Sequence, residues 1–148
     1  MTAGEVCNRQ VVVTQPDMRL VDAVNLMKTH HVGDLVVVKE PDDGQRAPIG
    51  ILTDRDVALA VDQLLRLPQL TVADVMSVDV VTSPEHESLY DTLKKMQSYG
   101  IRRLPVVNER GGLEGILTFD DVLELLSEEF TDLAKLVAKE QKRERLIH

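Results

Sequence analysis

The chain has little cysteine and few aromatic residues. Cys7 is the only cysteine among 148 residues, which excludes an intramolecular disulfide and makes a reducing cytoplasm the expected setting. Aromatic residues make up 3% of the sequence and tryptophan is absent, which argues against ligand capture by stacking on aromatic platforms. A planar ring bound by this chain would have to lie between aliphatic side chains and backbone.

Long apolar runs and an excess of positive charge are also missing. No apolar stretch approaches the roughly 20 residues of a membrane-spanning helix, and the first residues lack the basic-then-apolar pattern of a signal peptide. The formal net charge of −8 argues against non-specific nucleic-acid binding, which depends on Lys and Arg neutralising phosphates. We therefore expect neither a membrane nor a nucleic acid as a partner. The hydrophobic fraction of 43% is enough to build a core.

The chain contains an internal repeat. Four blocks recur in the same order, at offsets of 68, 69, 69 and 65 residues, and the changes of offset fall in expected turns. The matched blocks are Val12–Pro16 with Val80–Pro84, Leu20–Met27 with Leu89–Met96, Leu35–Val38 with Leu104–Val107, and Gly50–Val57 with Gly115–Val122. Four ordered matches indicate a duplicated unit.

Each copy has the pattern of a βαββα unit, which places the fold in the mixed α+β or α/β class. β-branched runs predict strands near 11–14 and 80–82, and apolar spacing predicts helices beginning at Leu20 and Leu89, the second ending at Gly100. The remaining elements are strands near 34–39, 48–52, 103–108 and 113–117, turns at Asp42-Asp43-Gly44 and Arg110-Gly111-Gly112, helices after Thr53 and Thr118, and short helices near 3–8 and 71–76.

The expected organisation is one repeat over 1–66, a linker and second repeat over 67–128, and a helical extension over 129–148. The linker lies near 66–72, and the short helix that follows it leads into the second copy. The final helix runs from Phe119 to about Arg145, with an apolar stripe formed by Leu126, Phe130, Leu133 and Val137. This stripe predicts a dimer interface, a docking face for a protein partner, or a helix folded back over its own core.

Residues 3–128 resemble the cystathionine-beta-synthase (CBS) domain family in its tandem form. The resemblance rests on the duplicated order, on Gly-Ile-Leu-Thr-x-x-Asp in both copies, and on the strand Ile101–Val107 with its Arg-x-Pro pattern. It implies two pseudo-symmetric repeats packed through their sheets, with ligand clefts between them, and a homodimer. It also implies a regulatory, non-catalytic module that binds AMP, ADP or ATP, with S-adenosylmethionine or NAD as alternatives.

The resemblance assigns ligand contacts to both copies. In the second-copy cleft the expected contacts are Thr82, Ile101, Arg102, Arg103, Leu104, Pro105, Thr118 and Asp121. In the first-copy cleft, which is expected to bind more weakly, they are Thr14, Gly33, Asp34, Leu35, Thr53, Arg55 and Asp56. The reasoning is that each aspartate accepts from ribose hydroxyls, while Arg102 and Arg103 bind phosphate and Asp34 repels it.

Two alternatives remain beside this assignment. Thr followed by Asp three residues later is also a relative of the capping box that begins many helices, so both pairs have a purely structural interpretation. The whole module is alternatively a structural dimerisation or docking unit with degenerate ligand sites. We find no complete acid–base or nucleophile set and no set of metal ligands, since the adjacent His30 and His31 do not share a helix face.

Overall fold

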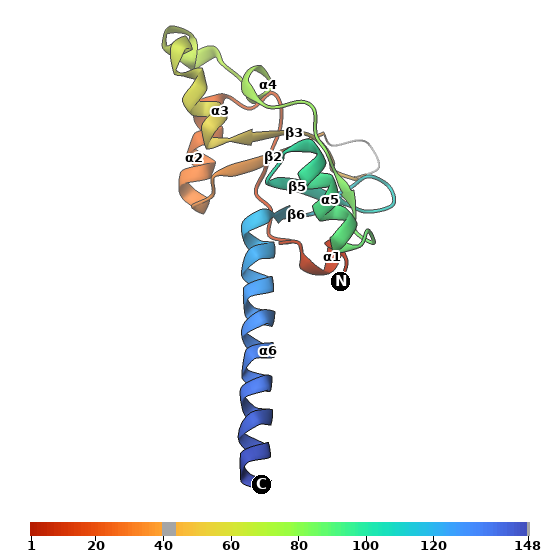
Figure 1. Cartoon of the computed structure of the whole chain (residues 1–148). Coiled ribbons are helices and arrows are strands. Elements are labelled where there is room, and N and C mark those ends of the chain that lie inside the picture. Colours follow the sequence, from red (N-terminus) through yellow and green to blue (C-terminus); the bar gives the residue numbers. More distant parts are fainter. Residues whose placement is uncertain (40–43, 148) are drawn as a thin grey trace.

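The computed structural model describes residues 1–39 and 44–147, and it has the predicted mixed α/β architecture of two similar halves plus a long C-terminal helix (Figure 1). The first half contains β1 (Val13–Thr14), α2 (Leu20–His30), β2 (Asp34–Lys39), β3 (Ala47–Thr53), α3 (Asp54–Leu59) and the 3-10 helix η1 (Ala60–Gln69). The second contains β4 (Ser83–Pro84), α5 (Leu89–Tyr99), β5 (Arg103–Val107), β6 (Leu113–Thr118) and α6 (Phe119–Ile147). Two short helices, α1 (Ala3–Val6) and α4 (Val72–Val75), precede these halves.

Each half forms a three-stranded sheet with the same connectivity. In the first sheet β1 pairs parallel with β2 and β2 pairs antiparallel with β3, and β4, β5 and β6 repeat this order. A register shift interrupts the antiparallel pair of both sheets, between Val37 and Val38 and between Val106 and Val107. The duplication read from the sequence is therefore a duplication of strand order and register.

The first strands of the two repeats are equivalent at an offset one residue larger than the sequence match predicts. The sequence pairs Thr14 with Thr82 at an offset of 68, whereas the sheets place Thr14 beside Val37 and Ser83 beside Val106, an offset of 69. The strand predicted at 80–82 is consequently wrong, because pairing begins at Ser83. The Val-Val-Thr sequence occurs in both repeats, but its second copy lies one residue earlier relative to the sheet than its first. Val80 and Val81 therefore lie before β4.

The two short helices pack on the opposite repeat from the one that follows them. α4 is tied to the first repeat, where the amides of Val72 and Ala73 donate to the carbonyls of Met18 (2.9 Å) and Pro16 (3.0 Å). α1 is tied to the second repeat in the matching way, with the amide of Ala3 donating to the carbonyl of Glu87 (2.8 Å). The helix expected at 71–76 thus leads into the second copy along the chain, as predicted, while it packs on the first.

Three apolar clusters stabilise this arrangement. One lies within the first repeat and includes Val72 of α4, and one lies within the second repeat and includes Ala3 of α1. The third joins the two sheets through Val36 and Val38 of β2 and Ile116 of β6, all at most 6% exposed. Burial of these side chains, at roughly 1.5–3 kcal/mol each, fixes how the repeats face each other.

Other boundaries follow local chemistry. α5 ends at Gly100, as predicted, and this glycine adopts left-handed backbone with φ of 64°. The linker expected over 66–72 is helical as far as Gln69. The turn expected at Asp42-Asp43-Gly44 lies mostly outside the described residues.

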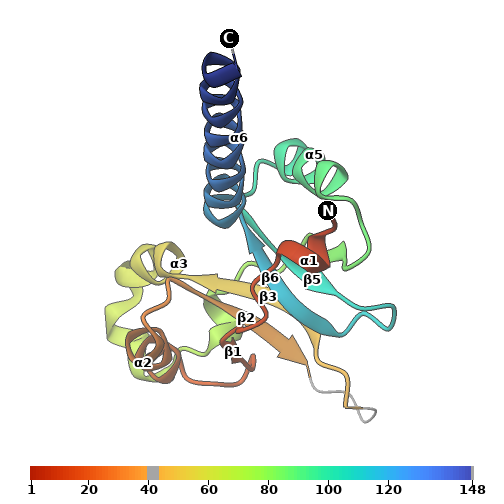
Figure 2. The same cartoon turned by 90° about the horizontal axis from the view of Figure 1, so that it is seen from below.

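α6 extends away from both sheets as a single helix of 29 residues (Figures 1 and 2). Its first turns are anchored to the second repeat, where Val122 is 2% exposed. From Glu128 to Leu146 every residue is exposed, so the helix is not folded back over its own core.

Candidate functional site

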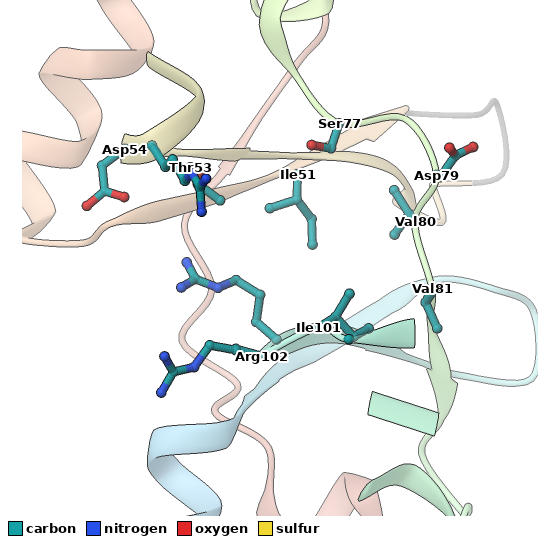
Figure 3. A pocket seen from close by; sticks show the side chains of 12 residues that line it. Ile51, Thr53, Asp54, Ser77, Asp79, Val80, Val81, Ile101 and Arg102 are labelled. Atoms are coloured by element: carbon teal, nitrogen blue, oxygen red, sulfur yellow. The ribbon is translucent and has the colours of Figure 1, made fainter. Parts of the chain in front are cut away.

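A cleft of about 360 Å³ lies between the two repeats, at the beginnings of α3 and β5 (Figure 3). Three segments contribute to it: the end of β3 with the start of α3, the connection after α4, and the turn between α5 and β5. The lining residues are Ile51, Thr53, Asp54, Arg55, Ser77, Asp79, Val80, Val81, Gly100, Ile101, Arg102 and Arg103.

One end of the cleft is apolar. Ile51 extends into it from β3, Val80 and Val81 border it from the connecting segment, and Ile101 lies opposite (Figure 3). All four side chains are only partly buried, so they offer aliphatic surface to a ligand. Ser77 and Asp79 add polar groups at the same end, which makes this end suited to a flat heterocycle with polar edges.

The other end of the cleft carries three arginines, Arg55, Arg102 and Arg103. Local structure aims the last two: Gly100 turns the chain, the amide of Ile101 donates to Met96 (3.0 Å), and the carbonyl of Arg102 accepts from the amide of Phe119 (2.7 Å). Guanidinium groups bind phosphate and carboxylate through paired hydrogen bonds. An anionic group therefore has a binding surface at this end.

The three arginines differ in how strongly they are engaged. Arg102 is exposed, with a guanidinium 3.8 Å from Oδ1 of Asp120 and 5.3 Å from the ring centroid of Phe119. Arg55 is exposed and makes no ion pair with any described residue. These two side chains are the more available partners for an incoming anion.

Arg103 is held by Asp34. Its Nη1 donates to Oδ2 of Asp34 at 2.6 Å, and both side chains are partly buried. Burial raises the pKa of Asp34 above its ordinary value, although the neighbouring Arg103 opposes that rise. Asp54 and Asp121 lie near enough to raise it further. The pair therefore places a carboxylate against one of the three arginines of the cleft.

The repeated Thr–Asp pairs act as helix caps. Oγ1 of Thr53 accepts from the amide of Asp56 (3.1 Å) and Oδ2 of Asp56 accepts from the amide of Thr53 (2.9 Å), which is a complete capping box. Oγ1 of Thr118 accepts from the amide of Asp121 in the same way (3.1 Å). Thr53 lines the cleft, whereas Asp56, Thr118 and Asp121 are not among its lining residues.

The remaining predicted contacts are in the core or at its edge. Thr14, Leu35, Leu104 and Pro105 are buried, and Thr82 is only partly buried, with its carbonyl accepting from Nζ of Lys95. Gly33 accepts, through its carbonyl, from the amide of Asp54 (2.9 Å). The cleft thus combines Ile101, Arg102 and Arg103, which the sequence places in one cleft, with Thr53 and Arg55, which it places in another.

A second hollow of about 540 Å³ lies at the pseudo-symmetric place, lined by Asn8, Gln10, Val11, Val12, Val13, His30 and Val32. Positions 8, 10, 11 and 12 correspond to 77, 79, 80 and 81 of the first cleft. The positions that correspond to Arg102, Arg103 and Arg55 hold Gly33, Asp34 and Asp120. The arginine-rich surface is therefore confined to one of the two places.

Both glycines of the repeated Gly-Ile-Leu-Thr motif lie against a segment of the chain that passes too close to leave room for a Cβ. A Cβ at Gly115 would lie 2.6 Å from Sγ of Cys7 and 2.8 Å from the carbonyl oxygen of Asn8. A Cβ at Gly50 would lie 2.6 Å from Sδ of Met76 and 3.0 Å from the carbonyl oxygen of Ser77. The backbone that approaches these glycines is thus the chain's own, where short bridges pair Asn8 with Ile116 and Ser77 with Ile51.

Sequence reasoning missed the segment Ser77–Val81 and the contribution of Ile51. The chain path indicates the role of this segment. The chain leaves α4 on the first repeat and must cross to β4 on the second, so it passes between the sheets. The assignment of Val80 and Val81 to a strand led to the wrong path for this segment, which crosses between the sheets. Within the part of the chain that the structure describes, no group of three His, Cys, Asp or Glu side chains is arranged to hold a metal, and no helix has the length and apolarity to cross a bilayer.

Comparison with known proteins assigns the family. The sequence profile of the CBS domain matches twice, over residues 3–63 and 72–128. The chain belongs to the CBS domain family. Its two CBS domains coincide with the two sheet-forming halves, and α6 beyond residue 128 lies outside both matches.

Several known proteins are similar over most of this chain. Protein MK0525 of Methanopyrus kandleri is 36% identical over 126 residues, which is 84% of this chain and 62% of that protein. The CBS domain-containing protein YhcV of Bacillus subtilis is 37% identical over 76% of each chain. Inosine-5'-monophosphate dehydrogenase of Methanocaldococcus jannaschii is 34% identical, but the match spans only 23% of the enzyme, so its activity is no guide to this chain.

Solved structures of CBS domain pairs have the same fold. The CBS domain pair of protein MJ0100, in complex with 5'-methylthioadenosine and S-adenosyl-L-methionine, superposes with a TM-score of 0.74 at 23% identity, covering 87% of this chain and 98% of that one. CBSX2 in complex with AMP superposes with a TM-score of 0.71 at 26% identity, covering 86% of this chain and 96% of that one.

Proposed function

We propose that this CBS domain pair is a regulatory module that binds an adenosine nucleotide in the cleft between its repeats. The carrying observation is the polarity of that cleft: aliphatic side chains and Asp79 lie at one end, and Arg55, Arg102 and Arg103 lie at the other. Adenine suits the first end and a phosphate group suits the second. AMP, ADP or ATP fits this distribution better than a ligand without phosphate.

The binding step follows from the same geometry. The adenine ring lies between Ile51 and Ile101, with its polar edge toward Asp79, and the phosphate accepts hydrogen bonds from Arg55 and Arg102. These groups belong to different repeats, so a bound nucleotide links the repeats directly. A ligand shifts the packing of the repeats to the extent that it binds one arrangement more tightly than another.

Similar proteins support a ligand of this class. CBSX2 has been solved with AMP, and the cytosolic domain of the Mg²⁺ channel MgtE, 26% identical over 84% of this chain, has been solved with ATP. S-adenosylmethionine and NAD are the alternatives. The three arginines outnumber Asp34 and Asp54 at this end of the cleft, so the sulfonium of S-adenosylmethionine matches it less well than a phosphate group does.

A structural module without a ligand is the second candidate. It is favoured by the complete capping box at Thr53 and by the Asp34–Arg103 pair, because both engage residues expected to contact ligand. In that case the chain acts through protein contacts alone.

Thermal unfolding in the presence of candidate ligands distinguishes these functions. AMP, ADP, ATP, S-adenosylmethionine, NAD and adenosine are added separately to the full chain at millimolar concentration. A ligand present at 100 times its Kd stabilises the native state by about 2.7 kcal/mol, so Tm rises by several degrees. The proposal predicts a larger rise for AMP, ADP or ATP than for adenosine. No rise with any of the six would favour the structural module.

A further inference from the structure

The side chain of Arg102 lies between the cleft and the start of α6. It lines the arginine-rich end of the cleft, and its guanidinium lies 5.3 Å from the ring centroid of Phe119 and 3.8 Å from Oδ1 of Asp120. Phe119 and Asp120 are the first two residues of α6, and neither is among the lining residues of the cleft. Figure 3 shows the Arg102 side chain on the side of the cleft where α6 begins. One cation is therefore shared between the cleft and the first turn of a helix outside it.

The backbone link at this point is present in both repeats, whereas the side-chain link is present in only one. The carbonyl of Arg102 accepts from the amide of Phe119 (2.7 Å), and the carbonyl of Gly33 accepts from the amide of Asp54 (2.9 Å). Gly33 is equivalent to Arg102 but has no side chain, so α3 begins with the backbone link alone. The fold therefore does not need the Arg102 side chain to begin this helix. The side-chain link belongs to the repeat that carries the long projecting helix.

The contacts of Arg102 with α6 are weak enough for a ligand to break. The ion pair with Asp120 is long, and its side chains are 71% and 85% exposed, so water screens most of the attraction. A guanidinium over a partly exposed aromatic ring is also held only modestly. A phosphate offers the same guanidinium two charged oxygens at short distance, which is a stronger interaction. A ligand phosphate in the cleft should therefore draw Arg102 away from Phe119 and Asp120.

We propose that Arg102 transmits occupation of the cleft to the first turn of α6, an inference that rests on the function proposed above. Without a nucleotide, the guanidinium covers Phe119 and pairs with Asp120. With a nucleotide bound, it contacts the phosphate instead. The coupling is reciprocal: a contact that holds Arg102 on α6 lowers the affinity for the nucleotide by the same factor by which the nucleotide weakens that contact.

The consequence is a change in the surface of α6 where the helix leaves the body. Phe119 is 42% exposed with the guanidinium over its ring, and Leu123, one turn further along, is 52% exposed. Departure of Arg102 uncovers more of the ring beside this leucine, and it leaves the carboxylate of Asp120 without this ion pair. A molecule that contacts this part of α6 therefore meets a more apolar and more acidic surface when the cleft is occupied.

Tryptophan fluorescence of the full chain tests this coupling. The chain has no tryptophan, so Phe119→Trp gives a single reporter at the start of α6. AMP should change its emission with the same Kd that isothermal titration gives for binding. Adenosine, which lacks the phosphate, should change the emission at least about threefold less at saturation. Leu146→Trp is the matched control, because it places the reporter at an exposed leucine near the far end of the same helix, where AMP should leave the emission unchanged.

Two arginine variants in the Phe119→Trp chain separate this coupling from ligand binding in general. Arg102→Ala removes the link, so saturating AMP should leave the emission unchanged. Arg55→Ala removes a phosphate contact on the first repeat, so AMP should bind about tenfold more weakly, but it should still change the emission once it saturates the cleft. Loss of the change in both variants, or in neither, would overturn the inference.

Titration calorimetry on the same samples distinguishes a failure of this coupling from a failure of the proposed function. Binding of AMP with no change in the Phe119→Trp emission would overturn the role of Arg102 and leave the cleft as a nucleotide site. No binding of AMP, ADP or ATP would overturn the proposed function and, with it, this inference.

Discussion

The guanidinium of Arg103 donates to the carboxylate of Asp34, and these residues occupy equivalent positions in the two repeats, 69 residues apart. One repeat therefore supplies a cation and the other an anion at the same structural position. Any phosphate that binds Arg103 must compete with Asp34, because both offer oxygen acceptors to the same donor. We therefore expect Asp34 to lower the affinity of the proposed cleft for phosphate-bearing ligands.

Asp34→Asn should strengthen the binding of AMP and ATP. The substitution removes the competing negative charge while it keeps the side-chain volume, and a gain of about 1.4 kcal/mol corresponds to a tenfold lower Kd. Isothermal titration of both nucleotides measures it. Asp62→Asn is the matched control, since it removes an equal charge from an exposed position outside the cleft. Equal gains in the two variants would mean that only the net charge matters.

Arg102→Ala should weaken nucleotide binding in proportion to ligand charge. The exposed guanidinium of Arg102 has a long ion pair to Asp120 at 3.8 Å, so it reorients toward a phosphate at little cost. We expect a loss of about tenfold or more in affinity for AMP and a loss of less than about threefold for adenosine. Arg110→Ala, in the β5–β6 turn and outside the cleft, serves as the control. A similar loss for both ligands would place Arg102 away from the phosphate.

A partly buried polar network stabilises the second repeat alone. Nζ of Lys95 donates to Oε2 of Glu87 (3.0 Å) and to Oγ of Ser83 (3.2 Å), and the hydroxyl of Thr92 donates to Oε1 of Glu87 (2.8 Å). The positions equivalent to 87, 92 and 95 in the first repeat hold Met18, Ala23 and Leu26, which are uncharged and belong to an apolar cluster. Sδ of Met18 accepts from the hydroxyl of Thr14 (3.0 Å).

Lys95→Leu should therefore destabilise the protein, because it leaves the Glu87 carboxylate without its cation. We expect a loss of about 3 kcal/mol in the free energy of unfolding. The triple change Glu87→Met, Thr92→Ala and Lys95→Leu, which copies the first repeat, should recover most of it. Urea unfolding measures both variants, and a triple variant as unstable as the single one would contradict this interpretation of the network.

The same network predicts how stability depends on pH. Partial burial opposes ionisation of Glu87, but hydrogen bonds from Lys95, Thr92 and Ser83 outweigh it and lower the pKa of this carboxyl. A lowered pKa contributes stability above the pKa of the unfolded chain, and this contribution disappears as pH falls through the folded value. Between pH 7 and pH 3 the wild-type protein should lose more stability than the triple variant. An identical acid profile for the two would exclude Glu87 as a contributor.

His31→Gly should stabilise the first repeat. His31 ends α2 in left-handed backbone with φ of 54°, and the equivalent position after α5 is Gly100 with φ of 64°. A side chain with a Cβ is strained in this conformation, at roughly 1 kcal/mol, although glycine also gives the unfolded chain more freedom. We expect a net gain of a few tenths of a kcal/mol in urea unfolding, and Gly100→His should cost more than this. A destabilised His31→Gly would indicate contacts of the imidazole that outweigh the strain.

The duplication made much of the fold readable from the sequence. The repeated Gly-Ile-Leu-Thr blocks predict the end of a strand and the start of a helix twice, and the structure has both. The glycine at 100 and the apolar spacing from Leu89 predict α5 and its end. These features depend on local chemistry, which a single sequence carries in full.

The composition of the cleft was harder to read because it depends on packing between repeats. α4 docks on the first repeat through backbone hydrogen bonds to Pro16 and Met18, and no side-chain pattern in the sequence predicts these bonds. That docking sends Ser77–Val81 between the sheets and brings Arg102 and Arg55 to one cleft. A grouping of residues by their own repeat therefore separates partners that lie together. The 2.6 Å contact of Arg103 with Asp34 could not be predicted from the sequence either. The repeat offset shows that the two residues are equivalent, but it does not show that they lie close together.

A crystal structure of the full chain grown with AMP tests directly whether the cleft between the repeats binds a nucleotide. We expect one nucleotide between Ile51 and Ile101, with its phosphate within hydrogen-bonding distance of Arg55 or Arg102. A nucleotide bound elsewhere, or an empty cleft in crystals grown at saturating AMP, would contradict it.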